Sequence, residues 1–287
     1  MTNLESLDFS TDPVQWNGLL PMNRLDARFA ALKASNQRAF VAYIAAGDPT
    51  LDKTVEIVRA LDEAGADVVE LGLPFSDPLA DGIVNQMAAD RAIRSGTTTP
   101  KVLEMIKTIR LHSQVPIVLF TYLNPVYTYG YERFHHDAAA AGADGVLVLD
   151  LPHDEADQNA ELKPCPDLAH IRLIAPTTPA QRVPVIAARA EGFIYYVSRE
   201  GVTGAQSTIA TGIGEMVASI KAATNVPVCV GFGISNPEQA ATVAGMADGV
   251  VVGSAIVKLI EKHGAEADVA EKVGAFVKPL VEAVKRV

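Results

Sequence analysis

The stretch from Ala64 to Gly82 reads AGADVVELGLPFSDPLADG. Its first four residues end an alanine-rich helical stretch, and Gly65 can take the left-handed turn with which many helices finish. A short run of β-forming residues follows at once. The same phrase returns as AGAD at Ala141 and as GMAD at Gly245, each time before another such run. The repetition predicts a unit in which a helix ends, the chain turns, and a strand begins.

Eight short β-rich runs alternate with helix-forming stretches along the chain. They begin at Ala39, Asp67, Pro116, Gly145, Arg172, Phe193, Pro227 and Gly249. Apolar runs that alternate regularly with helices are typical of parallel strands covered on both faces. Eight such units in 287 residues favour an α/β fold of the (β/α)8 TIM-barrel type, with an open doubly wound sheet as the alternative.

Composition restricts the class of protein. The formal charge is -10, so nucleic acid is not an expected partner, and 49% hydrophobic residues suffice for one large core. Cys165 and Cys229 have no metal-type spacing and are expected to be buried thiols. The N-terminus has no basic region before an apolar run, and no segment offers about 18 consecutive apolar residues. These features predict a cytoplasmic protein with no membrane partner.

Three carboxylates gather around the end of the second predicted strand. In a barrel of this type the chemistry lies at the C-terminal ends of the strands. Glu70 shares strand parity with Val68, so it is expected to project into the mouth of the barrel; the alternative is a strand-end glutamate paired with a neighbouring cation. Asp81 and Asp77 precede Gly and Pro and could be turn residues, which is the preferred interpretation for Asp77.

Glycines after the last two strands suggest a phosphate site. Gly233 follows the seventh strand, and Gly253 and Ser254 lie where the eighth gives way to a helix. Free backbone N–H groups at such positions bind phosphate in many barrels. No cation occurs here before Lys258, so amides and hydroxyls would hold the anion. The alternative is that these glycines only permit tight turns.

Other polar features carry less information. His135 and His136 are adjacent on a predicted helix and point to different faces; both are expected on the surface, and no metal site is expected. No Gly-x-Gly-x-x-Gly follows the first strand, so a dinucleotide fold has no support. The segment from Ser198, SREGVTGAQSTIATGIG, is long for a loop between a strand and a helix. It is expected to be a surface excursion or a mobile lid formed by residues 199–212.

Five motifs together resemble the α subunit of tryptophan synthase. They are ELGLPFSDPLADG from Glu70, FTYLNPVYTYG from Phe120, LDLPHDEA from Leu149, SREGVTG from Ser198 and GFGIS from Gly231. The resemblance covers one barrel domain over residues 22–287 and leaves 1–21 as an extension. It implies cleavage of indole-3-glycerol phosphate to indole and glyceraldehyde 3-phosphate. It also implies an α2β2 complex with a β subunit that carries pyridoxal phosphate, and no cofactor in this chain.

The resemblance also implies roles for individual residues. Breaking the carbon–carbon bond requires a proton at indole C3, a base for a glycerol hydroxyl, and an acceptor for the ring N–H. Glu70 is expected to be the acid and base, and Asp81 the N–H partner. The expected substrate-binding residues are Tyr43, Phe120, Tyr122, Tyr195 and Thr203. The expected phosphate-binding residues are Gly204, Gly233, Gly253 and Ser254. The expected partner interface comprises Asp77, Pro78, Asn124 and Pro125.

One position departs from the family pattern. The family usually has Pro after the Asp-Gly pair and Ile two positions later, whereas this chain has Ile83 and Asn85. Loss of the Pro is expected to loosen the loop that holds Asp81. Three other functions remain as alternatives at this stage: a stand-alone lyase, a sugar-phosphate isomerase or synthase, and a non-catalytic barrel that activates a β partner.

Overall fold

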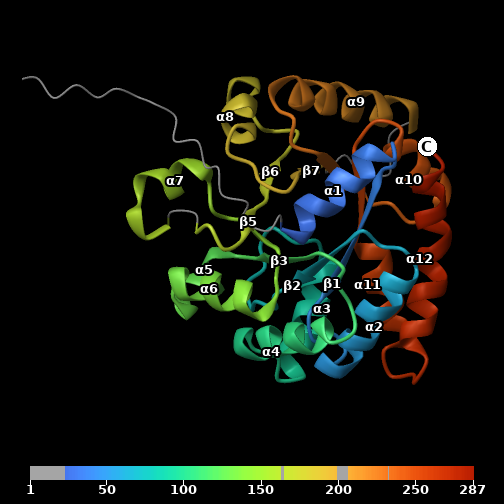
Figure 1. Ribbon diagram of the computed structural model, residues 1–287. Helices are drawn as coiled ribbons and strands as arrows, with labels where there is room; N and C mark the ends of the chain where they lie inside the picture. Colours follow the sequence, from blue (N-terminus) through green and yellow to red (C-terminus); the bar gives the residue numbers. More distant parts are fainter. Residues whose placement is uncertain (1–22, 163–164, 199–205, 232) are drawn as a thin grey trace, which may run out of the picture.

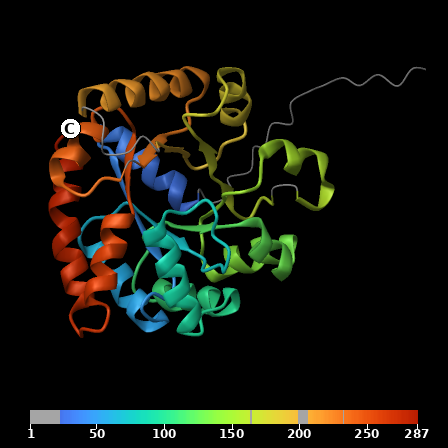
Figure 2. The same cartoon turned by 180° about the vertical axis from the view of Figure 1, so that it is seen from behind.

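The computed structural model describes residues 23–162, 165–198, 206–231 and 233–287. Parallel strands form a ring, and helices cover its outside in both views (Figures 1 and 2). The strands are β1 (Ala39–Ala45), β2 (Val68–Gly72), β3 (Ile117–Thr121), β4 (Gly145–Val148), β5 (Ala169–His170), β6 (Arg172–Ile174), β7 (Ile194–Val197), β8 (Val228–Gly231) and β9 (Gly249–Val252).

Within the described residues, one or two α-helices separate successive strands, except between β5 and β6. The α-helices in this part of the chain are α1 (Arg24–Ala34), α2 (Leu51–Glu63), α3 (Ile83–Arg94), α4 (Thr99–Arg110), α5 (Leu123–Tyr129), α6 (Tyr131–Ala141), α7 (His153–Gln158), α8 (Val183–Ala187), α9 (Gln206–Ala223), α10 (Pro237–Ala244), α11 (Ser254–His263) and α12 (Val269–Lys285). No helix in this described part of the chain is long and apolar enough to cross a membrane.

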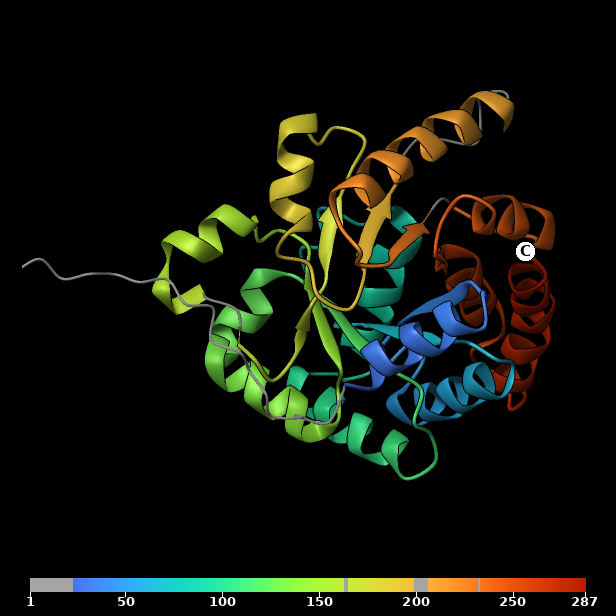
Figure 3. The ribbon, with the colours of Figure 1, turned by 45° about the horizontal axis from the view of Figure 1, so that its top comes forward.

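The order of the strands around the ring is β5-β4-β3-β2-β1-β9-β8-β7-β6. The two end strands, β5 and β6, are separated in sequence by Ile171 alone, so the polypeptide itself closes the ring (Figure 3). The fifth predicted strand, expected from Arg172, is β6, which pairs with β7; the short strand β5 just before it was not predicted and pairs with β4. The predicted (β/α)8 barrel is confirmed, with this additional strand as the difference.

Alternation along the strands separates two apolar layers. In β1, Val41 and Tyr43 belong to the cluster inside the ring, whereas Phe40 and Ile44 pack outward against the helices. Side chains from α1 join the inner cluster beside the first residues of the strands, so this helix closes the N-terminal end of the barrel. Since residues two apart share a face, Glu70 lies on the inner side with Val68.

The repeated turn before the strands takes its expected form twice. Gly65 and Gly142 have φ values of +93° and +103°, the left-handed region that favours glycine. Gly245, in the third copy, has a φ of -65° and ends its helix without that turn, so the expectation is wrong there.

The aspartate of each repeat has a structural task that the sequence did not reveal. Each carboxylate accepts the backbone N–H at or next to the start of the preceding strand: Asp67 from Phe40, Asp144 from Ile117 and Asp248 from Val228, at 2.6, 2.8 and 3.0 Å. The three bonds tie β1 to β2, β3 to β4, and β8 to β9. They lie at the end of the barrel opposite the carboxyl ends of the strands.

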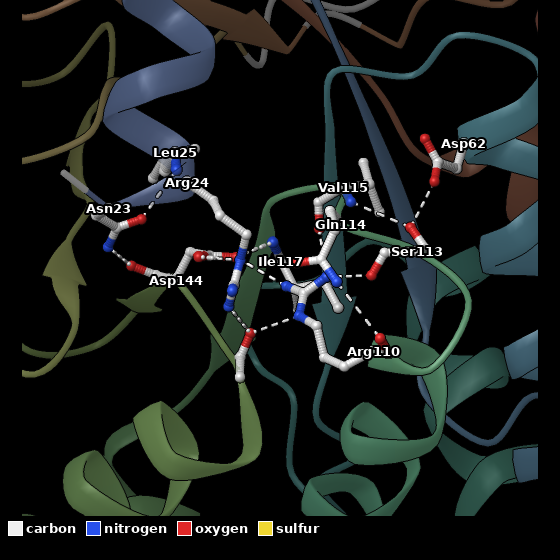
Figure 4. Close-up of polar contacts among 11 residues, drawn as sticks. Asn23, Arg24, Leu25, Asp62, Arg110, Ser113, Gln114, Val115, Ile117 and Asp144 are labelled. Atoms are coloured by element: carbon white, nitrogen blue, oxygen red, sulfur yellow. Dashed lines mark hydrogen bonds and ion pairs between the residues drawn. The ribbon is translucent and has the colours of Figure 1, made fainter. Parts of the chain in front are cut away.

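Figure 4 shows one of these aspartates in its setting. Asp144 forms ion pairs with Arg24 at 2.9 Å and with Arg110 at 2.8 Å, besides accepting the N–H of Ile117. Arg110 also donates to the carbonyl oxygen of Val115 at 2.7 Å. Burial lowers the pKa of Arg110 to about 10, and the nearby Asp144 opposes that change. The cluster fastens α1, α4 and β4 together at the N-terminal end of the barrel.

The structure corrects the expectation for one histidine. His136 is exposed, as predicted, but His135 is fully buried between α6 and the barrel. Its ring stacks on that of His170 in β5, with centroids 4.9 Å apart and an interplanar angle of 11°. The two adjacent residues do point to different faces of α6, as expected. The error was to expect both faces on the surface, because the face with His135 packs against the barrel.

The cysteines follow the expectation only in part. Both are free thiols, and Cys229 lies buried inside the barrel, whereas Cys165 is half-buried.

Candidate active site

Glu70 occupies the centre of β2, where it lies beside Tyr43 of β1 and Val118 of β3. Its side chain is completely buried, and neither carboxylate oxygen has a hydrogen-bond partner among the described residues. Burial raises the pKa of Glu70 from 4.5 to about 8, because the low-dielectric surroundings disfavour the charged form. Among the described residues no cation pairs with it, so they give the alternative of a strand-end ion pair no support. At neutral pH this carboxyl group can both release and accept a proton.

Asp81 lies on the loop between β2 and α3 and is held from several sides. The hydroxyl of Tyr122 donates to Asp81 Oδ2 at 2.7 Å and accepts the N–H of Ala80 at 3.1 Å. Burial and then the bond to Asp81 raise the pKa of Tyr122, so this phenol stays protonated and acts as the donor. The side chain of Asn85 also donates to the carboxylate, and that of Gln86 to the Asp81 carbonyl.

Both carboxylates act on the same two tyrosines, the buried Tyr43 and the half-buried Tyr195. Burial is the main cause of the raised pKa of Tyr43, followed by the charges of Asp81 and Glu70. The pKa of Tyr195 is raised by burial and then by the same two charges. Glu70 and Asp81 therefore both lie within electrostatic reach of Tyr43 and Tyr195.

Both tyrosines lie against a third aromatic ring. The ring of Phe120 lies edge-on to Tyr43, at 5.0 Å between centroids, and to Tyr195, at 6.5 Å. Gly72 and Gly231, at the ends of β2 and β8, lie directly against the phenol groups of Tyr43 and Tyr195, and a Cβ at either position would collide with them. Sequence reasoning did not predict either contact, because each one joins residues of neighbouring strands.

The expected phosphate-binding residues form two separate turns. Gly253 and Ser254 start α11, and the backbone of Gly253 lies so close to Tyr43 that an added Cβ would come within 3.2 Å of it. Gly233 is exposed, has a φ of +61°, and precedes α10, whose N-cap Asn236 accepts the N–H of Gln239 at 2.9 Å. Neither helix has a cation in its first turn.

Part of the expected site lies outside the described residues. Thr203 and Gly204 fall there, as does the first half of the segment expected to be a lid. From Gln206 onward the chain is the helix α9, so the expectation of an irregular loop through residue 212 is wrong for 206–212.

The expected partner-contact residues follow the carboxyl ends of β2 and β3. Asp77 and Asn124 are exposed, and Pro78 and Pro125 are half-buried. Asn124 and Pro125 belong to the short helix α5 and not to an open loop, because the chain after β3 turns helical at Leu123. Sequence reasoning missed the large apolar side chains exposed nearby. These are Leu79, Ile83 and Tyr127, with 89%, 67% and 59% of their surface exposed.

No cluster of three or more His, Cys, Asp or Glu side chains suited to a metal ion occurs in the described part of the chain. The polar groups at the mouth are instead two carboxylates, phenols and helix N-termini. A parallel (β/α)8 barrel with a buried carboxyl group of raised pKa beside a second carboxylate in an aromatic pocket defines an acid–base enzyme of the TIM-barrel class.

Comparison with known proteins places the chain more narrowly: it belongs to the family described as tryptophan synthase alpha chain, whose family model matches residues 29–285. The tryptophan synthase alpha chain of Geobacter sulfurreducens is 51% identical over 266 residues, which cover 92% of this chain and 99% of that protein. Family membership makes this chain a carbon–carbon lyase of tryptophan biosynthesis. The expected reaction, cleavage of indole-3-glycerol phosphate, is thereby confirmed.

Solved structures agree with this family. The crystal structure of tryptophan synthase subunit alpha from Legionella pneumophila is 39% identical, covers 93% of this chain and 100% of its own, and superposes with a TM-score of 0.82. A chain of tryptophan synthase from M. tuberculosis is 32% identical, covers 92% of this chain and 99% of its own, and gives a TM-score of 0.81.

Proposed function

We propose that Glu70 is the general acid and base of the α reaction, and that Asp81 binds the indole N–H. The observation that carries this proposal is the carboxyl group of Glu70, which is buried without a partner among the described residues and has a pKa of about 8. A group that must give a proton and take another works best when its pKa is near the operating pH. Asp81, held by hydrogen bonds on a partly exposed loop, is suited to the ionised state.

The two carboxyl groups divide the chemistry of the cleavage. Protonated Glu70 delivers a proton to indole C3, and the positive charge that appears at the ring nitrogen is balanced by Asp81. The Glu70 carboxylate then takes the proton of the glycerol hydroxyl next to the breaking bond. As that oxygen becomes a carbonyl, the C3–carbon bond breaks and its electron pair returns to the ring. Indole and glyceraldehyde 3-phosphate leave, and Glu70 is protonated again.

The remaining site residues bind the substrate. Tyr43, Phe120 and Tyr195 enclose the indole ring, which is flat and apolar and gains from burial between aromatic side chains. Tyr122 orients Asp81. The phosphate binds to Gly233, in the turn before α10, and to Gly253 and Ser254 at the N-terminus of α11, where backbone N–H groups favour an anion. Thr203 and Gly204 complete these two subsites in the proposal.

Two substitutions test the assignments. Glu70→Gln keeps the shape but transfers no proton, so kcat should fall by about 10²- to 10⁴-fold while the substrate still binds. Asp81→Asn should lower kcat as well, because an amide does not neutralise the indolenine cation. Asp77→Asn, an exposed acid on the same loop, is the matched control for the isolated chain. Indole release is the measurement, and turnover of Glu70→Gln near the wild-type rate would remove Glu70 from its role.

We also propose that the chain, with residues 22–287 as one catalytic domain, works in the cytoplasm in an α2β2 complex with a tryptophan synthase β subunit. The pyridoxal phosphate belongs to that partner, since the α chemistry needs only side chains. Exposed apolar side chains near the expected contact residues support docking of the β subunit at the mouth of the barrel. They are Leu79, Ile83 and Tyr127, beside Asp77, Pro78, Asn124 and Pro125. Direct transfer would retain indole, a small apolar product that crosses membranes.

A titration with a β subunit tests the complex. Indole-dependent tryptophan formation and the rate of the α reaction should both rise as the subunits associate. Pro78→Ala and Asn124→Ala should weaken the stimulation and leave the free energy of unfolding of the barrel close to wild type. If no complex forms and no stimulation occurs, the chain is a stand-alone lyase.

A further inference from the structure

The first turn of α3 contains two amide side chains that both reach back to Asp81. Gln86 Nε2 donates to the Asp81 carbonyl oxygen at 2.9 Å, and Asn85 Nδ2 donates to the carboxylate oxygen Oδ1 at 3.4 Å. Tyr122 holds the other carboxylate oxygen, Oδ2. The two oxygens of Asp81 thus have different donors, which approach from different elements of the fold.

The orientation of the Asn85 amide follows from its neighbour. If the amide were turned over, its oxygen would face the carboxylate oxygen of Asp81, and two acceptors would oppose each other. The nitrogen therefore faces Asp81. In this orientation Asn85 Oδ1 is buried and has no hydrogen-bond partner among the described residues.

The unpaired oxygen of the Asn85 amide is thus unfavourable for the stability of the fold. A buried acceptor without a donor loses its hydration and gains nothing in return, so an apolar side chain of the same size would be better tolerated for stability alone. Violations of this kind concentrate at functional sites. The bond to Asp81 is the one polar contact of the Asn85 side chain within the described residues.

The start of α3 offers little other support for Asp81. The N-cap residue, Gly82, has no side chain and makes no cap hydrogen bond. Ile83, the first residue of the helix, has 67% of its surface exposed. A proline at that position would have stiffened the chain through its fixed φ. The side-chain bonds of Asn85 and Gln86 supply constraint at the same place.

We propose that Asn85 is a positioning residue for Asp81. It fixes Oδ1 while Tyr122 fixes Oδ2, and together they set the plane of the carboxylate toward the ring nitrogen of the substrate. The inference rests on the proposed role of Asp81 and extends it. A correctly aimed carboxylate matters most where positive charge develops, so the effect belongs to the transition state more than to the bound substrate.

Two variants separate positioning from structural support. In Asn85→Leu the side chain keeps its size and loses both polar atoms. We expect kcat for indole-3-glycerol phosphate to fall about 5- to 10-fold, with KM within about twofold of wild type. The free energy of unfolding in urea should be unchanged or higher, because the unsatisfied oxygen is gone. Asp90→Asn, which loses a surface ion pair with Arg94 on the same helix, is the control.

Asn85→Asp supplies a readout that depends on charge. A second carboxylate beside Asp81 repels it, so the ratio of variant to wild-type kcat should be lowest near pH 8 and should rise as the pH falls toward 5. In an Asp81→Asn background, Asn85→Leu should cause little further loss, since the group it positions is gone.

The outcomes separate the two proposals. If Asp81→Asn keeps the wild-type kcat, the proposed catalytic role of Asp81 fails, and the positioning role of Asn85 fails with it. If wild type is active, but Asn85→Leu loses stability and keeps its kcat, or if its effect is undiminished in the Asp81→Asn background, the positioning role is overturned and the catalytic assignment stands.

Discussion

Wild type should lose free energy of unfolding as the pH rises, and the Glu70→Gln variant should not show this loss. In the folded protein burial raises the pKa of this carboxyl group to about 8, whereas its ordinary value is 4.5. Between these two pH values the folded state keeps a proton that the unfolded state releases. Stability that is present below pH 4.5 is therefore lost as the pH rises toward 8.

The size of this effect follows from the two values. Each pH unit inside the window weakens the folded state by about 1.4 kcal/mol, so at pH 7 the loss reaches about 3 kcal/mol and above pH 8 about 5 kcal/mol. Glutamine has nearly the same shape and does not titrate. Whatever constant cost its buried amide carries, the variant lacks this dependence on pH.

Urea unfolding of wild type and of Glu70→Gln at pH 5, 6, 7 and 8 measures the effect. The free energy of unfolding of the variant minus that of wild type should increase at each step from pH 5 to pH 8. Other titrating groups cancel, because both proteins share them. A difference that stays constant from pH 5 to pH 8 would refute the reasoning that burial without a partner raises the pKa of Glu70.

Three further changes have defined outcomes. Asp144→Asn leaves two arginines without their carboxylate and should lower the free energy of unfolding by about 3 kcal/mol in urea. Burial lowers the pKa of His135 and lowers that of His170 to about 3. The free energy of unfolding should therefore fall by roughly 2 kcal/mol between pH 7 and pH 5. A variant with Phe at both positions should lose most of this acid sensitivity in thermal melts. Tyr122→Phe removes a donor to Asp81 and should lower kcat about 10-fold in an indole-release assay, with substrate binding little changed.

Much of the barrel follows from local sequence. Strand alternation was enough to place Glu70 inside the ring, because parity along a strand decides the face of every residue. The break at Ile171 was not predictable, since it depends on how β5 pairs with β4 on one side and β6 pairs with β7 on the other. His135 was misplaced for a related reason: a helical pattern gives the angle between side chains but not which of two faces packs against the sheet.

The site was predictable where a motif carried it, and not where contacts cross the fold. Asp81 stood out in its motif, whereas the hydrogen bond from Tyr122 joins residues 41 positions apart. Asn85 appeared from sequence only as a departure from the family pattern. Its bond to Asp81 needs the actual turn at Gly82, which no spacing rule provides. The expected loosening of that loop stays a prediction.

The aspartates that precede β2, β4 and β9 have a consequence for how the barrel opens. Each protects a strand amide from solvent by a bond to a charged acceptor, so the N–H groups of Phe40, Ile117 and Val228 should be among the slowest to exchange with deuterated water. They can exchange only when neighbouring strands separate. Local opening of the barrel should therefore begin at the carboxyl ends of the strands. A loop at that end can rearrange around each substrate molecule while the strands stay paired.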